Sequence, residues 1–262
     1  MKGFMRIASW NINGMKARLG YLKHWLDARQ PDVVGLQELK MQDEQFPHES
    51  LAEVGYYAVV HGQKAWNGVA VLTRDKPAEV VQRGLPGQED MGARLLATRI
   101  DDLDFLTVYV PNGKNLEHDD YQRKLRWYDD LQAFLEKNFR LADPFVLCGD
   151  FNICPTALDS HAGEEATGEI FHTDAERDRI DKLLGWGLTD LYRHLHPDTQ
   201  TFSWWDYRAG AFPRNRGLRI DFLLGSEAIR DRVTEIETDR DYRKKKDDLS
   251  ASDHAPVMAV LQ

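Results

Sequence analysis

The segment L-C-G-D-F-N at residues 147–152 places two chemically useful side chains after an apolar run. Residues 144–148 have the length and composition of a buried strand, Gly149 ends the run, and Asp150 and Asn152 follow two residues apart. A carboxylate and an amide held at the end of a rigid strand can bind a metal ion or orient a water molecule. This segment therefore predicts part of a polar site.

The same pattern recurs at other strand-like runs. The runs are 5–10, 32–36, 104–110, 144–148, 219–224 and 256–261, and the adjoining motifs are W-N-I-N (10–13), L-Q-E-L-K (36–40), Y-V-P-N (109–112), G-D-F-N (149–152), R-I-D-F (219–222) and S-D-H-A-P (252–256). They supply four carboxylates, three amides, a phenol and an imidazole: Glu38, Asp150, Asp221, Asp253, Asn11, Asn13, Asn152, Tyr109 and His254. Because functional side chains commonly lie at strand ends that a rigid core holds, we expect these loops to converge.

These side-chain types favour metal-assisted hydrolysis of a phosphodiester. Carboxylate and amide oxygens suit Mg²⁺ or Mn²⁺, whereas the sequence offers no thiolate cluster for a soft metal. Phosphodiester hydrolysis needs neutralised phosphate oxygens, a water nucleophile and help for the leaving oxygen. Asp253 supplies a carboxylate beside the imidazole of His254, and Asp221 could orient that imidazole.

Each of these residues alone also has a structural interpretation. An Asp or Asn after a strand is often a turn residue or a helix cap. His194 and His196 precede Pro197, and we interpret them as part of a surface loop. Asp221 lies in an apolar run, where an unpaired charge is costly, so it needs a partner. The repeated use of the same side-chain types at six turns favours a functional site.

Length and composition favour one large α/β domain. The 262 residues are 42% hydrophobic and 10% aromatic, and no linker, repeat or low-complexity segment divides residues 1–262. Helical patterns at 19–26, 125–139 and 180–186 alternate with the strand-like runs and with hairpin-like runs at 56–61, 68–74, 78–84 and 93–100. This order predicts a layered fold in which two sheets pack between helices.

Charge, cysteines and hydropathy limit the partners and the compartment. The net charge of −9 disfavours a polyanionic partner. Screening limits the reach of exposed charges to about 8–10 Å, so local charge clusters matter more for binding than the net charge. Residues 207–219 carry four arginines and no acid next to several aromatic residues, a pattern that suits bases and phosphates, whereas we interpret 122–126 and 243–246 as solvated faces. Two cysteines and the lack of a long uncharged stretch favour the cytoplasm and no membrane partner. We expect Cys148 and Cys154 to be small buried side chains and the protein to be a monomer.

Together the motifs resemble the exonuclease III family of apurinic/apyrimidinic (AP) endonucleases, in the DNase I-like endonuclease/exonuclease/phosphatase superfamily. The similarity runs from W-N-I-N-G (10–14) to S-D-H-A-P (252–256). G-D-F-N and S-D-H are superfamily-wide, whereas L-Q-E-L-K, H-G-Q-K (61–64), N-G-V-A (67–70), Y-V-P-N-G (109–113), F-S-W-W-D-Y-R (202–208) and N-R-G-L-R-I-D (215–221) are typical of the DNA-repair branch.

The resemblance implies a fold, an activity and a substrate. The fold would be a four-layer α/β sandwich, DNase I-like, with two mixed β-sheets packed between helices. The activity would be Mg²⁺-dependent, with Mn²⁺ as a substitute, and would cleave 5′ to abasic sites. A 3′→5′ exonuclease and a 3′-phosphatase or phosphodiesterase activity would accompany it. The substrate would be double-stranded DNA with abasic sites, nicks or blocked 3′ ends.

The resemblance also implies residue roles. Metal contacts would come from Asn11, Asn13, Glu38, Asp150, Asn152 and Asp253, and catalytic groups from Tyr109, Asp150, Asn152, Asp221 and His254. Asp150 would act on the attacking water as base or orienter, Asn152 and Tyr109 would contact the phosphate, and Asp221 would orient an imidazolium at His254. Some relatives carry aspartate at the position of Asn13. This difference leaves open whether the site holds one metal ion or two.

For DNA, the resemblance implies contacts at Asn112, Trp204, Arg208, Asn215, Leu218 and Ile220. Trp204, Leu218 and Ile220 would wall a pocket for a flipped-out abasic sugar, and Arg208 would reach into the duplex. The segment G-E-I-F-H-T-D (168–174) is expected near the mouth of this pocket, where a bulky Phe171 or His172 would admit a 3′ end and hinder an internal abasic site.

Two other functions remain compatible with this superfamily. Phosphoinositide phosphatases and sphingomyelinases use the same core on lipid headgroups, but the cation-rich aromatic segment 202–219 favours DNA. Some relatives have lost catalysis and act as RNA-binding or regulatory proteins. Such a protein should have lost metal or catalytic residues, and none of the nine site positions is degraded here.

Overall fold

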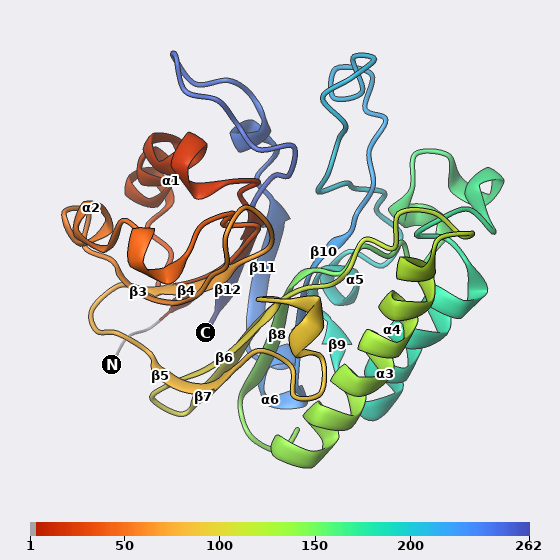
Figure 1. Cartoon of the computed structure of the whole chain (residues 1–262), viewed down its shortest axis with the longest axis horizontal. Helices are drawn as coiled ribbons and strands as arrows, with labels where there is room; N and C mark the ends of the chain where they lie inside the picture. Colours follow the sequence, from red (N-terminus) through yellow and green to blue (C-terminus); the bar gives the residue numbers. More distant parts are fainter. Residues whose placement is uncertain (1–3) are drawn as a thin grey trace.

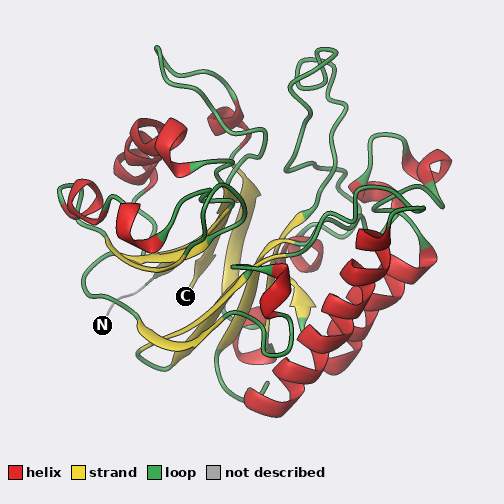
Figure 2. Ribbon diagram, viewed as in Figure 1, coloured by secondary structure: helices red, strands yellow, loops and turns green. Residues whose placement is uncertain are grey.

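The computed structural model describes residues 4–262 as two six-stranded β-sheets packed against each other between layers of helices (Figures 1 and 2). Side chains from both sheets fill the space between them, among them Ile7, Val71, Phe105 and Val146. The four-layer α/β sandwich that the sequence predicts is thereby confirmed. Among the described residues, no helix is long and apolar enough to cross a membrane.

The first sheet has the strand order β11-β12-β1-β2-β4-β3. The strands are β1 (Met5–Asn11), β2 (Val33–Gln37), β3 (Tyr57–His61), β4 (Val69–Thr73), β11 (Val233–Thr238) and β12 (Val257–Leu261). β1 and β2 are parallel, and the other neighbours are antiparallel. Helices α1 (Met15–Arg29) and α2 (His48–Ala52) cover its outer face, because apolar side chains such as Leu22, Trp25 and Leu26 recur on one side of α1.

The second sheet has the strand order β5-β6-β7-β8-β10-β9. The strands are β5 (Glu79–Arg83), β6 (Leu95–Ile100), β7 (Leu103–Tyr109), β8 (Phe145–Asp150), β9 (Thr189–Asp190) and β10 (Asp221–Gly225). The long helices α3 (Asp119–Asn138) and α4 (Asp174–Trp186) cover its outer face (Figure 1), and the short helices α5 (Leu191–Leu195) and α6 (Glu227–Arg230) pack beside it. α4 begins with a capping box formed by Thr173 and Glu176 and ends at Gly187.

Some expectations about local structure were wrong. The sequence patterns missed β9, β11 and the short helices, and His194 lies in α5 rather than in a loop. The helix forms there because the Asp190 carboxylate accepts hydrogen bonds from the backbone N–H groups of Tyr192 and Arg193. The strand expected over 219–224 begins only at Asp221.

Strand direction brings the polar strand ends to one side of the molecule. β1 and β2 run parallel, so both end at the same edge of the first sheet. In the second sheet, Tyr109 pairs with Asp150 across β7 and β8, and Asp221 pairs with Asp150 across β8 and β10. Two loops project beyond the sheets at the top of Figure 1, one before β10 and one between β11 and β12. The site lies at the base of these loops.

Candidate active site

Side chains from the two sheets meet directly at this edge. Asn11 at the end of β1 donates a hydrogen bond from Nδ2 to Asp150 Oδ2 at 2.9 Å, and the same nitrogen lies 3.2 Å from Glu38 Oε1. The Tyr109 hydroxyl donates to Glu38 Oε1 at 2.6 Å. Residues of the first sheet, Asn11 and Glu38, are thus bound to Tyr109 and Asp150 of the second. The predicted convergence is present.

The repeated N-x-N and D-x-N spacing reflects one local backbone turn. The side-chain oxygen of Asn11 accepts from the backbone N–H of Asn13 at 3.0 Å, and Asp150 Oδ1 accepts from the backbone N–H of Asn152 at 3.0 Å. Asn13 and Asn152 have φ values of 48° and 50°, in the left-handed region that Asn tolerates better than most residues. The second side chain of each turn bonds to another loop of the site, Asn13 to Asp253 and Asn152 to the Val110 carbonyl.

His254 is held between two carboxylates. Its Nδ1 lies 2.8 Å from Asp221 Oδ2, and its Nε2 lies 3.8 Å from Asp150 Oδ2. The Ser203 hydroxyl donates to the same Asp221 oxygen at 2.6 Å. Burial lowers the pKa of His254, but the neighbouring Asp221 outweighs it and raises that pKa to about 10. Burial raises the pKa of Asp150 to about 7 against the opposing effect of His254.

Glu38 and Asp253 are kept ionised by their neighbours. Burial alone would raise the pKa of Glu38, but Lys40 and the Tyr109 hydrogen bond lower it below its usual value. Burial likewise opposes ionisation of Asp253, whose pKa is lowered by His254 and by hydrogen bonds from Trp204 Nε1 at 3.0 Å and Asn13 Nδ2 at 2.8 Å. The result is a cluster of anionic oxygens at the edge of the sheets.

Two groups of side chains could hold a cation. Asp150, Asp221 and His254 offer ligand atoms within 4.8 Å of one another, but His254 already bonds to Asp221 there. The second group is Glu38 and Asn13. It already accommodates a cation, because the Lys40 ammonium lies 2.9 Å from Glu38 Oε2 and 2.5 Å from Asn13 Oδ1. Its hard oxygen donors suit Mg²⁺ or Mn²⁺. The chemistry of the donors therefore favours the group around Glu38.

Amide groups line the site next to Asp150. Asn152 Nδ2 donates to the Val110 carbonyl at 3.0 Å, and Asn112 Nδ2 lies 3.4 Å from Asn152 Oδ1. Beneath them, the buried Lys124 ammonium donates to the Asn152 carbonyl at 2.7 Å and to Glu176 Oε1 at 2.5 Å. Asn112 and Asn152 are thereby fixed beside Tyr109 and Asp150.

An apolar wall adjoins these polar groups. Cys154, Leu218 and Ile220 form a small cluster, and Trp204 and Phe171 pack against it. Phe171 has a left-handed backbone, with φ of 72°. His172 points elsewhere, because it is buried and its Nδ1 lies 2.9 Å from the Ile170 carbonyl oxygen. Of the two bulky residues in this loop, Phe171 is the one at the wall.

Other predicted contacts lie apart from this cluster. Arg208 and Asn215 are exposed on the loop before β10, where Arg208 pairs with Asp206 at 2.7 Å. The expectation that Arg219, with the other arginines of 207–219, contacts bases and phosphates is wrong. Arg219 is buried and pairs with Asp159 at 2.6 Å and Asp190 at 2.8 Å, because those two carboxylates compensate its charge.

Sequence reasoning left several site neighbours without a role. They are Lys40, Arg94, Lys124, Glu176 and Ser203. Lys40 stands two residues after Glu38, and this spacing could have marked it. Arg94 stacks on the Tyr109 ring at 4.8 Å, but nothing in its local sequence indicates that contact. Both cysteines are buried and free, as expected.

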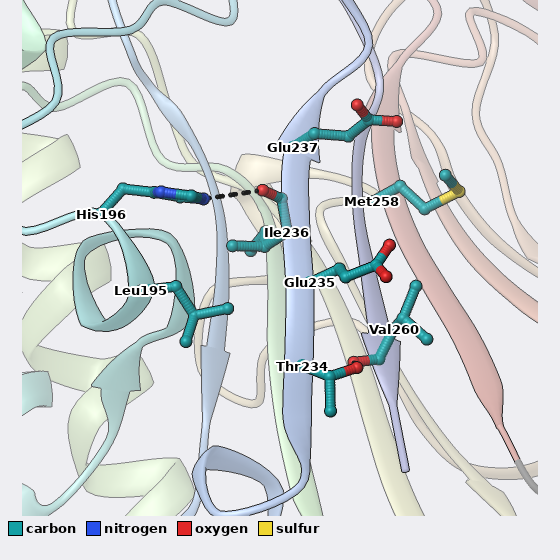
Figure 3. Close-up of a pocket in the computed structure, with 8 residues that line it drawn as sticks. All are labelled: Leu195, His196, Thr234, Glu235, Ile236, Glu237, Met258 and Val260. Atoms are coloured by element: carbon teal, nitrogen blue, oxygen red, sulfur yellow. Dashed lines mark hydrogen bonds between the residues drawn. The ribbon is translucent and has the colours of Figure 1, made fainter.

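A surface groove between α5 and the β11–β12 pair lies outside this site (Figure 3). Leu195 and His196 form one side, and Ile236, Met258 and Val260 belong to the other. His196 Nε2 lies 3.1 Å from the Ile236 carbonyl oxygen, which ties the two sides together. None of the predicted site residues lines this groove.

Comparison with known proteins gives consistent matches. Residues 8–254 match the Endonuclease/Exonuclease/phosphatase family. The chain is 38% identical to an exodeoxyribonuclease III of Haemophilus influenzae, over 98% of this chain and all of that one, and 30% identical to an exodeoxyribonuclease of Bacillus subtilis, over 98% and 99%. An AP endonuclease structure from Archaeoglobus fulgidus matches with a TM-score of 0.94 at 30% identity over 98% and 99% of the two chains. The 3′ phosphatase NExo from Neisseria, bound to a product DNA hairpin, matches with a TM-score of 0.92 at 34% identity and the same coverage.

Proposed function

The chain belongs to the endonuclease/exonuclease/phosphatase family, and we propose that it is a DNA repair nuclease that hydrolyses phosphodiesters with a divalent metal ion. The ion is Mg²⁺, with Mn²⁺ as a substitute. The activities are AP endonuclease cleavage 5′ to abasic sites, 3′→5′ exonuclease and 3′-phosphatase or phosphodiesterase action on double-stranded DNA. The observation that carries this proposal is the meeting of Glu38 and Asn11 from one sheet with Tyr109 and Asp150 from the other, in a chain similar along its whole length to exodeoxyribonuclease III.

In this proposal, the oxygen atoms around Glu38 hold the ion. Asn11 bonds to both Glu38 and Asp150, and the backbone N–H of Asn152 bonds to Asp150. Asn13 reaches Glu38 through the Lys40 ammonium, and Asp253 accepts a hydrogen bond from Asn13. When bound, the ion neutralises charge on the phosphate oxygens. The Lys40 ammonium must then leave its place between Glu38 and Asn13, and it can turn toward the phosphate.

The side chains then divide the work of hydrolysis. Asp150 orients the attacking water and takes its proton. Asn152 donates a hydrogen bond to a phosphate oxygen, and Tyr109 does the same once its hydroxyl turns from Glu38 to the phosphate. His254 stays protonated because the Asp221 carboxylate accepts from its Nδ1, so its Nε2–H stabilises the charge that develops on the phosphate. This division makes Asp150, and not His254, the general base.

The surrounding surface suits a DNA duplex. The wall formed by Cys154, Leu218 and Ile220 can take an unstacked sugar, and Trp204 closes one side of it. Arg208 and Asn215 are exposed on the loop before β10, and this exposure supports a contact with the duplex beyond the cleaved phosphate. We propose that the protein acts as a monomer in the cytoplasm.

Two labelled duplexes test the function. One carries an internal abasic-site analogue and the other a 3′-phosphate. We expect Mg²⁺-dependent cleavage of both, loss of cleavage in EDTA, and no comparable hydrolysis of inositol phosphates. Asp150→Asn should lose about a hundredfold in rate, equivalent to about 2.7 kcal/mol of transition-state stabilisation. Preference for inositol phosphates would contradict the DNA substrate, and near-normal cleavage by Asp150→Asn would remove Asp150 from the mechanism.

A further inference from the structure

A second polar layer lies directly beneath the site, inside the space between the sheets. Ser9, Thr107 and Cys148 precede Asn11, Tyr109 and Asp150 by two residues on β1, β7 and β8. Residues two apart on a strand share one face of the sheet, so each site residue has a polar neighbour one step deeper. All three deeper residues are fully buried.

Gln37 joins these residues across the two sheets. From β2 of the first sheet, its Nε2 lies 2.8 Å from Thr107 Oγ1 of the second sheet. The same nitrogen lies 3.1 Å from Ser9 Oγ and 3.1 Å from the Gly35 carbonyl. Gln37 is fully buried, and its Oε1 has no hydrogen-bond partner within residues 4–262.

The two sheets approach each other closely at this layer. A Cβ atom placed on Gly35 would come within 2.6 Å of Cys148 Sγ and 2.8 Å of Thr107 Oγ1. Both distances are far below van der Waals contact, so glycine is required here by space. Gly35 pairs with Ser9 in the parallel β1–β2 ladder. The close approach and the Gln37 hydrogen bonds therefore belong to the same level of the core.

Stability alone does not account for this layer. Most of the remaining space between the sheets is filled by apolar side chains such as Ile7, Val71 and Phe105, and the buried hydroxyl of Thr98 bonds within its own sheet. Replacing both partners of a buried hydrogen bond by apolar groups of the same shape is nearly neutral or stabilising. A buried amide with an unsatisfied oxygen is thus an energetic burden that an apolar residue would relieve. What an apolar residue cannot supply is a directional link between the sheets.

We propose that Gln37 is a positioning residue that fixes the spacing of the two sheets just beneath the site. Glu38 follows it directly and must stay within hydrogen-bond reach of Tyr109, 2.6 Å away on the other sheet. Loss of the Gln37–Thr107 link lets the sheet edges shift, and the Glu38 carboxylate then moves relative to Tyr109 and Asp150. As far as it concerns metal binding and cleavage, this inference rests on the proposed function.

Gln37→Met and Thr107→Val test the link, because each keeps the approximate size of the side chain and removes the hydrogen bond. Each single variant leaves a buried polar partner unpaired and should unfold at a modestly lower urea concentration than the wild type, whereas the double variant Gln37→Met/Thr107→Val, which removes both partners, should unfold near the wild-type concentration. The Mn²⁺ concentration that half-saturates the protein without DNA should rise about fivefold or more, and kcat should fall about tenfold with little change in KM for DNA. Thr98→Val is the matched control, because Thr98 is a buried threonine of the same sheet whose hydroxyl donates to the Phe105 carbonyl at 2.8 Å. It should leave Mn²⁺ binding and kcat unchanged.

A double-mutant cycle on stability tests the link without any activity. In the wild type, Tyr109→Phe removes the hydrogen bond to Glu38 and should lower the urea midpoint. In the Gln37→Met background the same change should lower it clearly less, because Glu38 no longer sits in place. Equal losses in the two backgrounds, or wild-type Mn²⁺ binding and kcat in Gln37→Met, would overturn the positioning role. A wild type that neither binds Mn²⁺ nor cleaves DNA would instead contradict the proposed function, and the cycle would still decide on Gln37.

Discussion

The Nδ1 atom of His254 lies 2.8 Å from Asp221 Oδ2, and this contact sets the orientation and charge of the imidazole. Both residues are buried, and the Ser203 hydroxyl donates to the same Asp221 oxygen. With Nδ1 bound in this way, Nε2 faces Asp150 at 3.8 Å. Asp221 therefore acts on the reaction through His254 rather than by touching the substrate.

Asp221→Asn should lower kcat by about a hundredfold, or about 2.7 kcal/mol. The amide keeps the size of the side chain but removes the negative charge that favours the imidazolium, so the pKa of His254 falls. Single-turnover removal of a 3′-phosphate measures the effect, with circular dichroism as the check on folding. Ser203→Ala is the control, because it leaves the Asp221 charge in place and should cost much less. Wild-type rates in Asp221→Asn would contradict the role of the pair.

The His254 contact also predicts a pH dependence of stability in metal-free protein. The pKa of His254 is about 10 in the folded state, whereas the ordinary pKa of a histidine is 6.5. Because the folded state binds the proton more tightly, this contribution to stability is complete below pH 6.5 and is lost as the pH rises through about 10. The urea midpoint of the wild type, relative to His254→Gln, should thus be largest below pH 6.5 and shrink toward pH 10. A difference that does not vary with pH would show that His254 does not titrate in this way.

The polar turns at the strand ends could be predicted because the residues that form each turn are adjacent in the sequence. In N-I-N (11–13) and D-F-N (150–152), the first side chain caps the turn that presents the second, so two residues of spacing record the geometry. Arg219 was misread because its partner Asp159 lies 60 residues away and leaves no local trace. The cross-sheet contact of Gln37 with Thr107, 70 residues away, escaped notice for the same reason.

β11 was missed because its hydrophobic period is broken. Its register shifts between Val233 and Glu235, and this irregularity places the buried residues Val233 and Ile236 three positions apart instead of two. A search for strict alternation therefore fails on this strand. The α/β class and the layers could still be predicted, because they rest on the long regular strands and helices.

Glu38→Ala should raise the Mg²⁺ concentration needed for half-maximal cleavage about tenfold or more, equivalent to about 1.4 kcal/mol. It removes a carboxylate whose pKa is held low and which is available to a cation. Lys40→Met is the opposing variant, because the Lys40 ammonium lies 2.9 Å from Glu38 Oε2 and competes with the ion for it. Its Mg²⁺ requirement should fall or stay level. An unchanged metal titration in Glu38→Ala would remove Glu38 from the metal site.

Lys124→Met should lower the free energy of unfolding by about 3–5 kcal/mol, because it leaves a buried carboxylate without its partner. Lys124 and Glu176 are both fully buried and lie 2.5 Å apart. Urea unfolding measures the loss. Lys23→Met is the matched control, since Lys23 pairs with Glu53 at the surface and should cost less than about 1 kcal/mol. Equal losses for the two variants would mean that the buried pair contributes no more to the free energy of unfolding than the surface pair.

Phe171→Ala should shift the balance of substrates toward the internal abasic site. Phe171 packs against the wall of Cys154, Leu218 and Ile220, where its ring takes up space that a sugar within a continuous strand needs more than a terminal one. Rates on the abasic-site duplex and on the 3′-phosphate duplex give the ratio, which should rise about fivefold or more, or about 1 kcal/mol. His172→Ala is the control, because His172 is buried and turned toward the Ile170 carbonyl, and its ratio should match the wild type. If the ratio moved in His172→Ala and not in Phe171→Ala, the wall would not be where the substrates are distinguished.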